Sequence, residues 1–241
     1  MKAVLWIDEI EKAIGDDEKS KKLIGRLLTI LQEFHSPTGY QIDGFFWVTA
    51  NDISVIAERY PELLRSGRFS RIFFIDFPKP EVAKELFAFY FDQFLKKRLY
   101  SPEVEKFENS LKSLLAKYKE TFLQYFLDYE QIKYSQEKMT SHIFLPAGTE
   151  SEGWEERLFT FTPAEIAESV KLFFLKTFYR LHIQHYQGSW EKFLEAFGRF
   201  LKGGYKEIIA EIYEEIKPVA IAMRDGIAKQ KGYGERFTPA D

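Results

Sequence analysis

The sequence contains no cysteine among its 241 residues. This absence excludes disulfides and thiolate metal sites, and it is typical of proteins in a reducing compartment. No apolar run approaches the roughly 18 residues that a membrane-spanning helix requires. Acidic residues appear from Asp8 onward, before any long apolar region of the kind that a signal peptide contains. We therefore expect a cytoplasmic protein with no membrane partner.

An excess of positive charge is also missing. Lys and Arg together number 34, and Asp and Glu together number 37, which gives a formal net charge of −3 at pH 7. Without a general positive field, nucleic acid is not favoured as a partner. Hydrophobic residues make up 45% of the chain, which predicts a packed core rather than a disordered chain.

Three short apolar runs lie in the N-terminal third of the chain, at residues 3–7, 45–48 and 72–75. Between them, residues 23–34 and 54–64 have apolar side chains at helical spacing. This order of strand, helix, strand, helix and strand is typical of a parallel α/β sheet with crossover helices. Because each run is continuously apolar, we expect three strands that are buried on both faces.

Beyond residue 80 the strand signal nearly disappears, and amphipathic helices are predicted instead. These predicted helices cover residues 81–99, 104–129, 163–186 and 190–216. A less regular stretch at residues 135–158 separates the second helix from the third. We place a domain boundary at this change of composition, with an α/β subdomain at residues 1–79 and a mainly helical domain at residues 80–241.

The helix predicted from residue 163 has an explicit start signal. Thr162 and Glu165 fit a capping box, in which each side chain accepts a hydrogen bond from the other residue's backbone amide. Pro163 suits the first helical position. Aromatic residues recur along this helix at helical spacing, and we expect them in the core of the domain: Phe173, Phe174, Phe178 and Tyr179.

Polar residues that suit phosphoryl transfer follow the predicted strands. Asp8 and Glu9 come directly after the first run, and Asn51 follows the second. Phosphoryl transfer depends on positioning and charge stabilisation, so its carboxylates must lie on a rigid element such as a strand end. Arg65 and Arg68 precede the third run, from where they can reach a phosphate on a neighbouring subunit. Taken singly, each also fits a plainer interpretation as a solvated strand-end acid, turn amide or loop arginine.

Taken together, these segments resemble a known family. VLWIDEIEKAI, FFWVTANDI and PELLRSGRFSRIFFIDFP are similar to the Walker B, sensor 1 and second-region-of-homology segments of AAA ATPases of the FtsH and proteasomal type. FTPAEIAESV resembles the lid motif, with Pro163 in place of the usual glycine. The segments LWIDEIEKA and TANDI and the C-terminal segment PVAIAMRDGIAKQKGYGERF are most similar to a poorly characterised AAA family of cyanobacteria and algal plastids.

The resemblance implies a role for each matching residue. Asp8 would orient Mg²⁺, Glu9 would be the catalytic base, and Asn51 would be the sensor 1 residue. Arg65 and Arg68 would be arginine fingers that act on ATP bound by a neighbouring subunit. Such proteins typically form hexameric rings, because the fingers do not reach their own nucleotide.

The resemblance also implies a function for the helical domain. The lid helix that begins at Thr162 would close over the adenine of ATP, with Thr162 and Ala164 as the nucleotide-binding residues. Residues 98–157 match no part of the family and are expected to be an insertion in this lid. The implied activity is ATP hydrolysis coupled to remodelling of an unknown macromolecule.

One part of the family pattern is missing, because the sequence contains no G-x-x-x-x-G-K-[ST] loop. In the family this loop precedes Walker B by about one β-α-β unit, roughly 30 residues or more. We therefore expect an incomplete P-loop-type sheet, in a truncated chain that is inactive alone. Either a separate polypeptide with the P-loop fills the missing strand position, or the third strand shifts across to pair directly with the second, or the chain is poorly stable alone. The alternative is a non-catalytic helical scaffold derived from an AAA protein.

Overall fold

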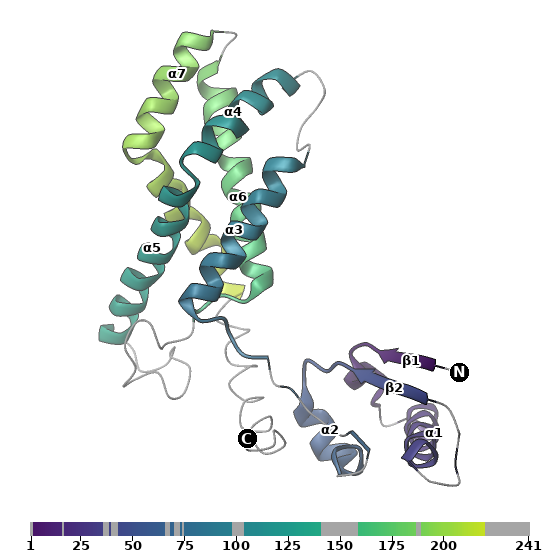
Figure 1. Ribbon diagram of the computed structural model, residues 1–241. Helices are drawn as coiled ribbons and strands as arrows, with labels where there is room; N and C mark the ends of the chain where they lie inside the picture. Colours follow the sequence, from purple (N-terminus) through teal and green to yellow (C-terminus); the bar gives the residue numbers. More distant parts are fainter. Residues whose placement is uncertain are drawn as a thin grey trace. The chain divides into compact units, whose positions relative to one another are not determined.

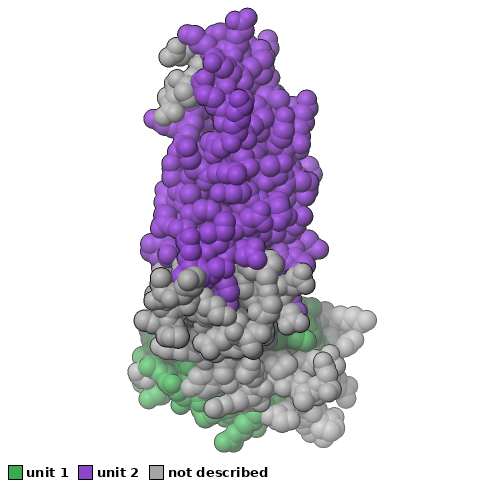
Figure 2. Space-filling model, turned by 90° about the vertical axis from the view of Figure 1, so that its left-hand side faces the viewer, with its two compact units in different colours: residues 1–76, 225–241 green, residues 77–224 purple. Residues whose placement is uncertain are grey.

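The computed structural model describes residues 2–15, 17–35, 39, 43–65, 68–69, 73, 75–97, 104–140, 159–186 and 189–219. The chain divides into two compact units, one with residues 1–76 and 225–241 and the other with residues 77–224 (Figure 2). The functional domains predicted at residues 1–79 and 80–241 stay predictions. Of the predicted insertion, residues 104–140 are described.

The first unit is built on two parallel strands. Strands β1 (Lys2–Ile7) and β2 (Asp43–Val48) pair in a register that places Ile7 opposite Val48 (Figure 1). The parallel direction requires a crossover connection, which contains helix α1 (Glu18–His35). Both chain segments therefore leave the sheet at the same edge, immediately before the acids and the amide singled out in the sequence.

One face of this sheet is covered. Ile7, Phe46 and Val48 pack against a core contributed by α1, the short 3₁₀ helix η1 (Ile10–Ala13) and helix α2 (Ile53–Arg59). Figure 1 shows α1 and α2 on the same side of the strands. The Phe34 ring meets the Phe46 ring edge-on, with centroids 4.9 Å apart.

The opposite face is exposed. The exposed fractions are 72% for Val4, 67% for Trp6, 54% for Phe45 and 50% for Trp47. The expectation of strands buried on both faces is therefore wrong for this face, because within the described residues no helix packs on it. A continuous apolar run predicts the strand, but it does not show which part of the molecule covers each side.

The third predicted strand, residues 72–75, is not confirmed. Phe73 and Ile75 are not in a strand, and their exposed fractions are 70% and 85%. Ile72 and Phe74 lie outside the described residues. Within the part of the chain that the structure describes, the sheet has two strands.

Proline divides the helix that was predicted over residues 54–64. Helix α2 ends at Arg59, and a separate 3₁₀ helix, η2, runs over Pro61–Leu64. Pro61 has no N–H to donate, and it disfavours helical geometry at Tyr60. The start of α2 is fixed by Asp52, whose carboxylate accepts a hydrogen bond from the Ser54 amide at 2.9 Å.

The second unit is mainly helical. Its elements are α3 (Pro80–Lys96), α4 (Glu105–Lys117), α5 (Lys119–Thr140), α6 (Pro163–Phe178), the π-helix η5 (Tyr179–Tyr186), α7 (Trp190–Arg199), the π-helix η6 (Phe200–Gly204) and a helix over residues 205–219 (Figure 1). None of the described helices is long and apolar enough to cross a membrane.

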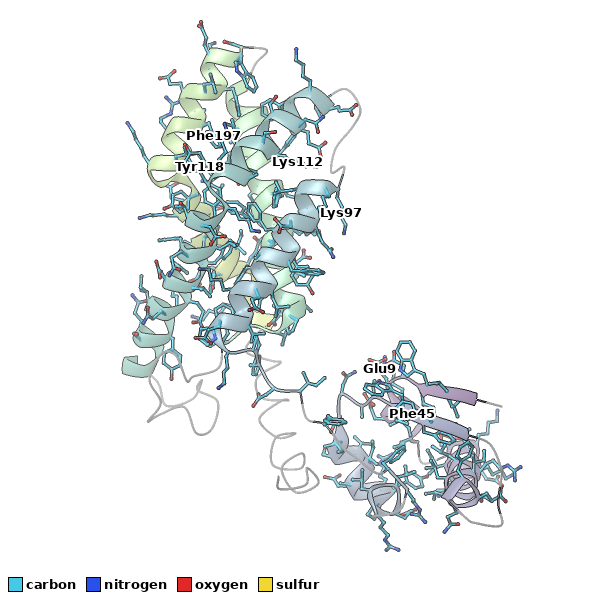
Figure 3. The ribbon with its side chains drawn as sticks, in the orientation of Figure 1. Glu9, Phe45, Lys97, Lys112, Tyr118 and Phe197 are labelled. Atoms are coloured by element: carbon cyan, nitrogen blue, oxygen red, sulfur yellow. The ribbon has the colours of Figure 1, made fainter. Side chains whose placement is uncertain are left out.

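Two of the predicted helices are interrupted. The helix expected over residues 104–129 is α4 and α5, because Tyr118 leaves helical geometry at φ −110° and ψ 12°. Its ring lies 6.2 Å from that of Phe197 (Figure 3). The helix expected over residues 190–216 is broken at Gly203, which has φ 178° and ψ −20°. Helix α5 also extends through Thr140 into the stretch expected to be irregular.

The core of the second unit is aromatic. Phe122 is fully buried, and its ring lies 5.1 Å from Phe173, 5.7 Å from Phe200 and 5.3 Å from Tyr205. The core positions predicted on α6 are confirmed for Phe173, Phe174 and Phe178. The prediction is wrong for Tyr179, which is 57% exposed. Tyr179 begins the π-helix, where wider winding changes the direction that successive side chains take.

Candidate functional site

The ends of β1 and β2 are joined by backbone hydrogen bonds beyond the strands themselves. The Thr49 amide donates to the Ile7 carbonyl at 3.0 Å, and the Ile10 amide donates to the Thr49 carbonyl at 3.0 Å. The intervening residues are Asp8 and Glu9, so the acidic pair is enclosed between two ladder-like contacts. The expectation that these acids lie at a rigid strand end agrees with this geometry.

Thr49 contacts both acidic residues. Its hydroxyl donates to Oδ1 of Asp8 at 2.5 Å and accepts a hydrogen bond from the Glu9 amide at 3.0 Å. Sequence reasoning missed this residue. The available signal was its position directly after Val48, which in a parallel pair places it opposite Asp8.

Asn51 lies against the acidic pair, as its position after the second strand suggested. Its side-chain Nδ2 donates to Oε1 of Glu9 at 2.7 Å, and its backbone amide donates to Oε1 of Glu11 at 2.9 Å. Glu11 was not predicted as part of the site. Its second oxygen, Oε2, is buried and has no hydrogen-bond partner within the described residues.

Glu9 has an unusual backbone conformation. It lies in the left-handed region at φ 50° and ψ 57°, and among the described residues it is the one non-glycine residue with a positive φ. Such a conformation is uncommon for a residue with a side chain. Here it turns the chain from β1 into η1, where Figure 3 labels Glu9, and the Glu9 carboxylate accepts the hydrogen bond from Asn51.

A lysine also contacts the Glu9 carboxylate. Lys12 forms an ion pair with Oε2 of Glu9, although the Lys12 side chain is 71% exposed. The hydrogen bond and the negative charge of Glu9 raise the pKa of Lys12, and the charges of Glu11 and Asp8 add to this effect. Three carboxylates and one ammonium therefore gather at the strand ends, so the local charge is negative.

The Asp8 carboxylate fits a hydrated cation. It is exposed, and no hydrogen bond among the described residues uses its Oδ2 atom. Mg²⁺ keeps several of its waters and is often bound through one or two carboxylates. Among the described residues no group of three or more His, Cys, Asp or Glu side chains is arranged to hold a metal ion directly. The exposed Oδ2 atom of Asp8 offers one ligand position to an ion that keeps most of its own waters.

The two arginines are not brought to the acidic pair. The Arg65 backbone amide donates to the Glu62 carbonyl at 3.3 Å, and its side chain is exposed. The Arg68 guanidinium donates to the same carbonyl. Within the described residues neither arginine forms an ion pair with Asp8 or Glu9. Gly67, between them, lies outside the described residues.

The predicted lid residues lie in the second unit, at the start of α6. The capping box is confirmed: the Thr162 amide donates to Oε2 of Glu165 at 2.8 Å, and the Glu165 amide donates to the Thr162 hydroxyl at 3.4 Å. Pro163 occupies the first turn, and Ala164 is exposed. These contacts define the helix start, and the adenine-binding role of Thr162 and Ala164 stays a prediction.

Curated proteins similar to this chain are named uncharacterized AAA domain-containing protein ycf46. The chain is 33% identical to that of Trieres chinensis over 97 residues, which cover 38% of this chain and 18% of the relative. It is 36% identical to the protein of Pyropia yezoensis over 93 residues, which cover 36% of this chain and 17% of the relative. It is 41% identical to the protein of Guillardia theta over 81 residues, which cover 31% of this chain and 14% of the relative. No protein-family model and no solved structure matches.

These matches confirm the resemblance that the sequence motifs carried. The class of protein that the chain resembles is that of proteins with an AAA domain. More particularly, the similarity is to the poorly characterised ycf46 proteins of algal plastids. The chain spans less than a fifth of the length of the relatives it matches.

Proposed function

We propose that this chain is the C-terminal part of an AAA ATPase and supplies hydrolytic residues for ATP cleavage coupled to remodelling of an unknown macromolecule. The observation that carries the proposal is the 2.7 Å contact between Asn51 and Glu9, beside Asp8, at adjoining ends of two parallel strands. A carboxylate, an amide and a second carboxylate at such an edge can position a water molecule, a phosphate oxygen and a hydrated cation.

The proposed roles follow from the chemistry of each side chain. Glu9 accepts a proton from the attacking water, and Asn51 orients that water without adding charge. Asp8 holds the water shell of Mg²⁺, which when bound neutralises phosphate charge. Thr49 keeps Asp8 and the Glu9 backbone in register through its hydroxyl.

The remaining predicted residues belong to the assembly. Arg65 and Arg68 make no ion pair with the acids of their own chain within the described residues, which agrees with fingers that act on a neighbour's phosphate. We propose a ring, hexameric by analogy with the family, in the cytoplasm. The second unit would form its lid, with Thr162 and Ala164 facing the adenine.

ATP binding by this chain alone is proposed to be weak or absent. The sequence lacks the glycine-rich loop and lysine that grip phosphate in P-loop proteins. Isothermal titration of the 241-residue chain with ATP–Mg²⁺ tests this directly. Micromolar affinity would refute the proposed dependence on a separate polypeptide that carries the loop.

The second candidate is a non-catalytic scaffold, which the missing loop favours. The Glu9→Gln variant separates the two, because Gln keeps the oxygen that accepts from Asn51 but is not a base. In an assembly of this chain with a polypeptide that bears the loop, we expect at least a roughly 100-fold loss of ATP turnover. Glu18→Gln is the matched control, because Glu18 pairs with Lys22 on the exposed side of α1. A scaffold would show equal activity in both variants.

A further inference from the structure

Asn51 is held at two points by one acidic turn. Its side-chain Nδ2 donates to Oε1 of Glu9 at 2.7 Å, and its backbone amide donates to Oε1 of Glu11 at 2.9 Å. Asn51 is exposed and lies outside both β2 and α2, so the hydrogen bonds within those elements do not fix its backbone amide. The Glu11 carboxylate therefore holds the backbone of Asn51, while Glu9 holds its side chain.

Glu11 stands on a turn that is anchored in the core of the first unit. It belongs to the short helix η1 and lies between Ile10 and Ile14, which are both buried. The Ile14 amide donates to the Glu11 carbonyl at 3.1 Å, which closes the turn. A side chain positions another group well when it stands on an element that is fixed by packing. Glu11 meets this condition, whereas the exposed Asn51 does not.

The second oxygen of the Glu11 carboxylate is left unpaired by folding. Oε2 is buried and has no hydrogen-bond partner within the described residues. An acceptor buried in this way destabilises the folded protein, because it gives up its hydrogen bonds to water. The contact made by Oε1 adds little stability in return, since the exposed Asn51 would be hydrated without it. A residue that lowers stability beside candidate hydrolytic groups is expected to serve activity.

We propose that Glu11 is a positioning residue for the proposed reaction, and that its Oε1 atom fixes the Asn51 backbone so that the Asn51 side chain reaches Glu9. This inference rests on the proposed function, in which Asn51 and Glu9 act on the attacking water. Without the Glu11 contact, the backbone at Asn51 can turn, and its side-chain amide moves away from Glu9. Displacements of about 1 Å in an active site can lower a rate roughly 100-fold.

The contacts of Glu11 disfavour a direct chemical role. A general base must offer a carboxylate oxygen to the attacking water, and a metal ligand must offer one to the ion. Oε1 of Glu11 accepts from the Asn51 amide, and Oε2 is buried. Asp8, by contrast, is exposed and has an oxygen that no hydrogen bond uses within the described residues. The role that remains for Glu11 is that of acceptor for the Asn51 amide.

Two variants of the full 241-residue chain separate the acceptor from the charge. Glu11→Gln keeps an oxygen that can accept from the Asn51 amide but removes the charge, whereas Glu11→Met is of similar length and has no such acceptor. Nuclear magnetic resonance measures cross-relaxation between the Asn51 side-chain amide and the methylene protons of Glu9. We expect this signal to be lost in Glu11→Met and kept in Glu11→Gln.

Turnover is measured in the assembly of this chain with a polypeptide that bears the loop. Glu11→Met should lower kcat about tenfold or more and change KM less than about twofold, because the lost positioning acts on the chemical step. Glu11→Gln should retain most of the wild-type kcat. Glu58→Met is the matched control, because Glu58 is exposed on α2, and it should leave kcat unchanged.

Stability separates positioning from a structural role. In urea unfolding followed by tryptophan emission, Glu11→Met should have a midpoint equal to or above that of the wild type, because a buried unpaired oxygen is removed. A lower midpoint, or failure of this variant to fold, would overturn the proposal and assign Glu11 to the packing of the turn. Persistence of the Asn51 to Glu9 signal in Glu11→Met would also overturn it, as would equal losses of kcat in Glu11→Met and Glu11→Gln.

The two proposals fail in different ways. If Glu11→Met loses the Asn51 to Glu9 signal but Glu9→Gln leaves ATP turnover unchanged, the positioning contact stands and the proposed activity falls. If Glu9→Gln abolishes turnover while Glu11→Met keeps both the signal and the wild-type kcat, the activity stands and the role of Glu11 falls.

Discussion

At the scale of single residues, Thr49 is the side chain on which the geometry of the acidic pair depends. One hydroxyl bonds both the Asp8 carboxylate and the Glu9 amide, and the Thr49 backbone bonds on both sides of the pair. The Glu9 conformation at positive φ is therefore supported by Thr49, directly after β2, and by Lys12, whose amide donates to the Glu9 carbonyl at 2.9 Å.

Thr49→Val should destabilise the first unit by about 1 kcal/mol, because the Glu9 amide, which is partly buried, loses its acceptor while the side-chain shape is kept. Urea unfolding followed by tryptophan emission measures the change. Thr49→Ser retains the hydroxyl and is expected to lose less than half as much. A larger loss in Thr49→Ser than in Thr49→Val would mean that the methyl group, not the hydroxyl, supports the strand ends.

At the scale of elements, ion pairs join the helix over residues 205–219 to its neighbours. Lys133 on α5 pairs with Glu214 at 2.9 Å, and Lys176 on α6 pairs with Glu215 at 2.9 Å. The bond to Lys133 lowers the pKa of Glu214, and the same bond raises the pKa of Lys133. The two shifts are opposite in direction, and both favour the charged form, as expected for one shared hydrogen bond between a carboxylate and an ammonium.

The pH dependence of this contact follows from the two directions. Because the Glu214 pKa is lowered by folding, its contribution is present above the unfolded value of about 4.3 and is lost as pH falls through the folded value. Because the Lys133 pKa is raised, its contribution is lost only at strongly alkaline pH. Glu214→Gln should therefore lower Tm at pH 7 and have little effect near pH 3.

Thermal melts at the two pH values measure this difference. The expected loss at pH 7 is a few tenths of a kcal/mol, since Glu214 is more than half exposed and water screens the pair. Glu191→Gln, on the exposed side of α7, is the control. A loss that persists unchanged at pH 3 would show that Glu214 acts through packing rather than charge.

The helix boundaries also show where a local sequence pattern was sufficient to predict the structure and where it was not. The capping box at Thr162 and Glu165 is a local pattern of four residues, and it forms as predicted. The prediction of one continuous helix over residues 104–129 was wrong, because no proline or glycine marks the break at Tyr118. That break is associated with ring contacts to distant residues such as Phe197, which a local pattern does not contain.

At the scale of the whole molecule, the two units differ in how their apolar residues are used. The second unit buries a connected aromatic core, in which Phe87 stacks on Phe126 with centroids 4.6 Å apart. The first unit buries a smaller aliphatic core on one side of its sheet and exposes aromatic residues on the other. A helical unit can close its core by itself, whereas a two-stranded sheet needs further layers.

Phe122→Ala should destabilise the second unit by about 3–5 kcal/mol, because Phe122 is fully buried among rings from several helices and its removal leaves a cavity. Chemical denaturation followed by far-ultraviolet circular dichroism measures the loss. Phe122→Leu should lose markedly less. A loss below about 1 kcal/mol for Phe122→Ala would show that the surrounding rings collapse into the space.

The sequence by itself determined the parallel pair of strands, the acids and amide at their carboxyl ends, and the helix start at Thr162. These features depend on short-range patterns of polarity and on the rule that parallel strands end at one edge. Only the tertiary structure decided that Thr49 contacts the acidic pair, that Tyr179 faces solvent and that Trp6 is exposed. Each of these depends on which residues from other segments lie against a side chain, and the pattern along one strand or helix does not specify its neighbours.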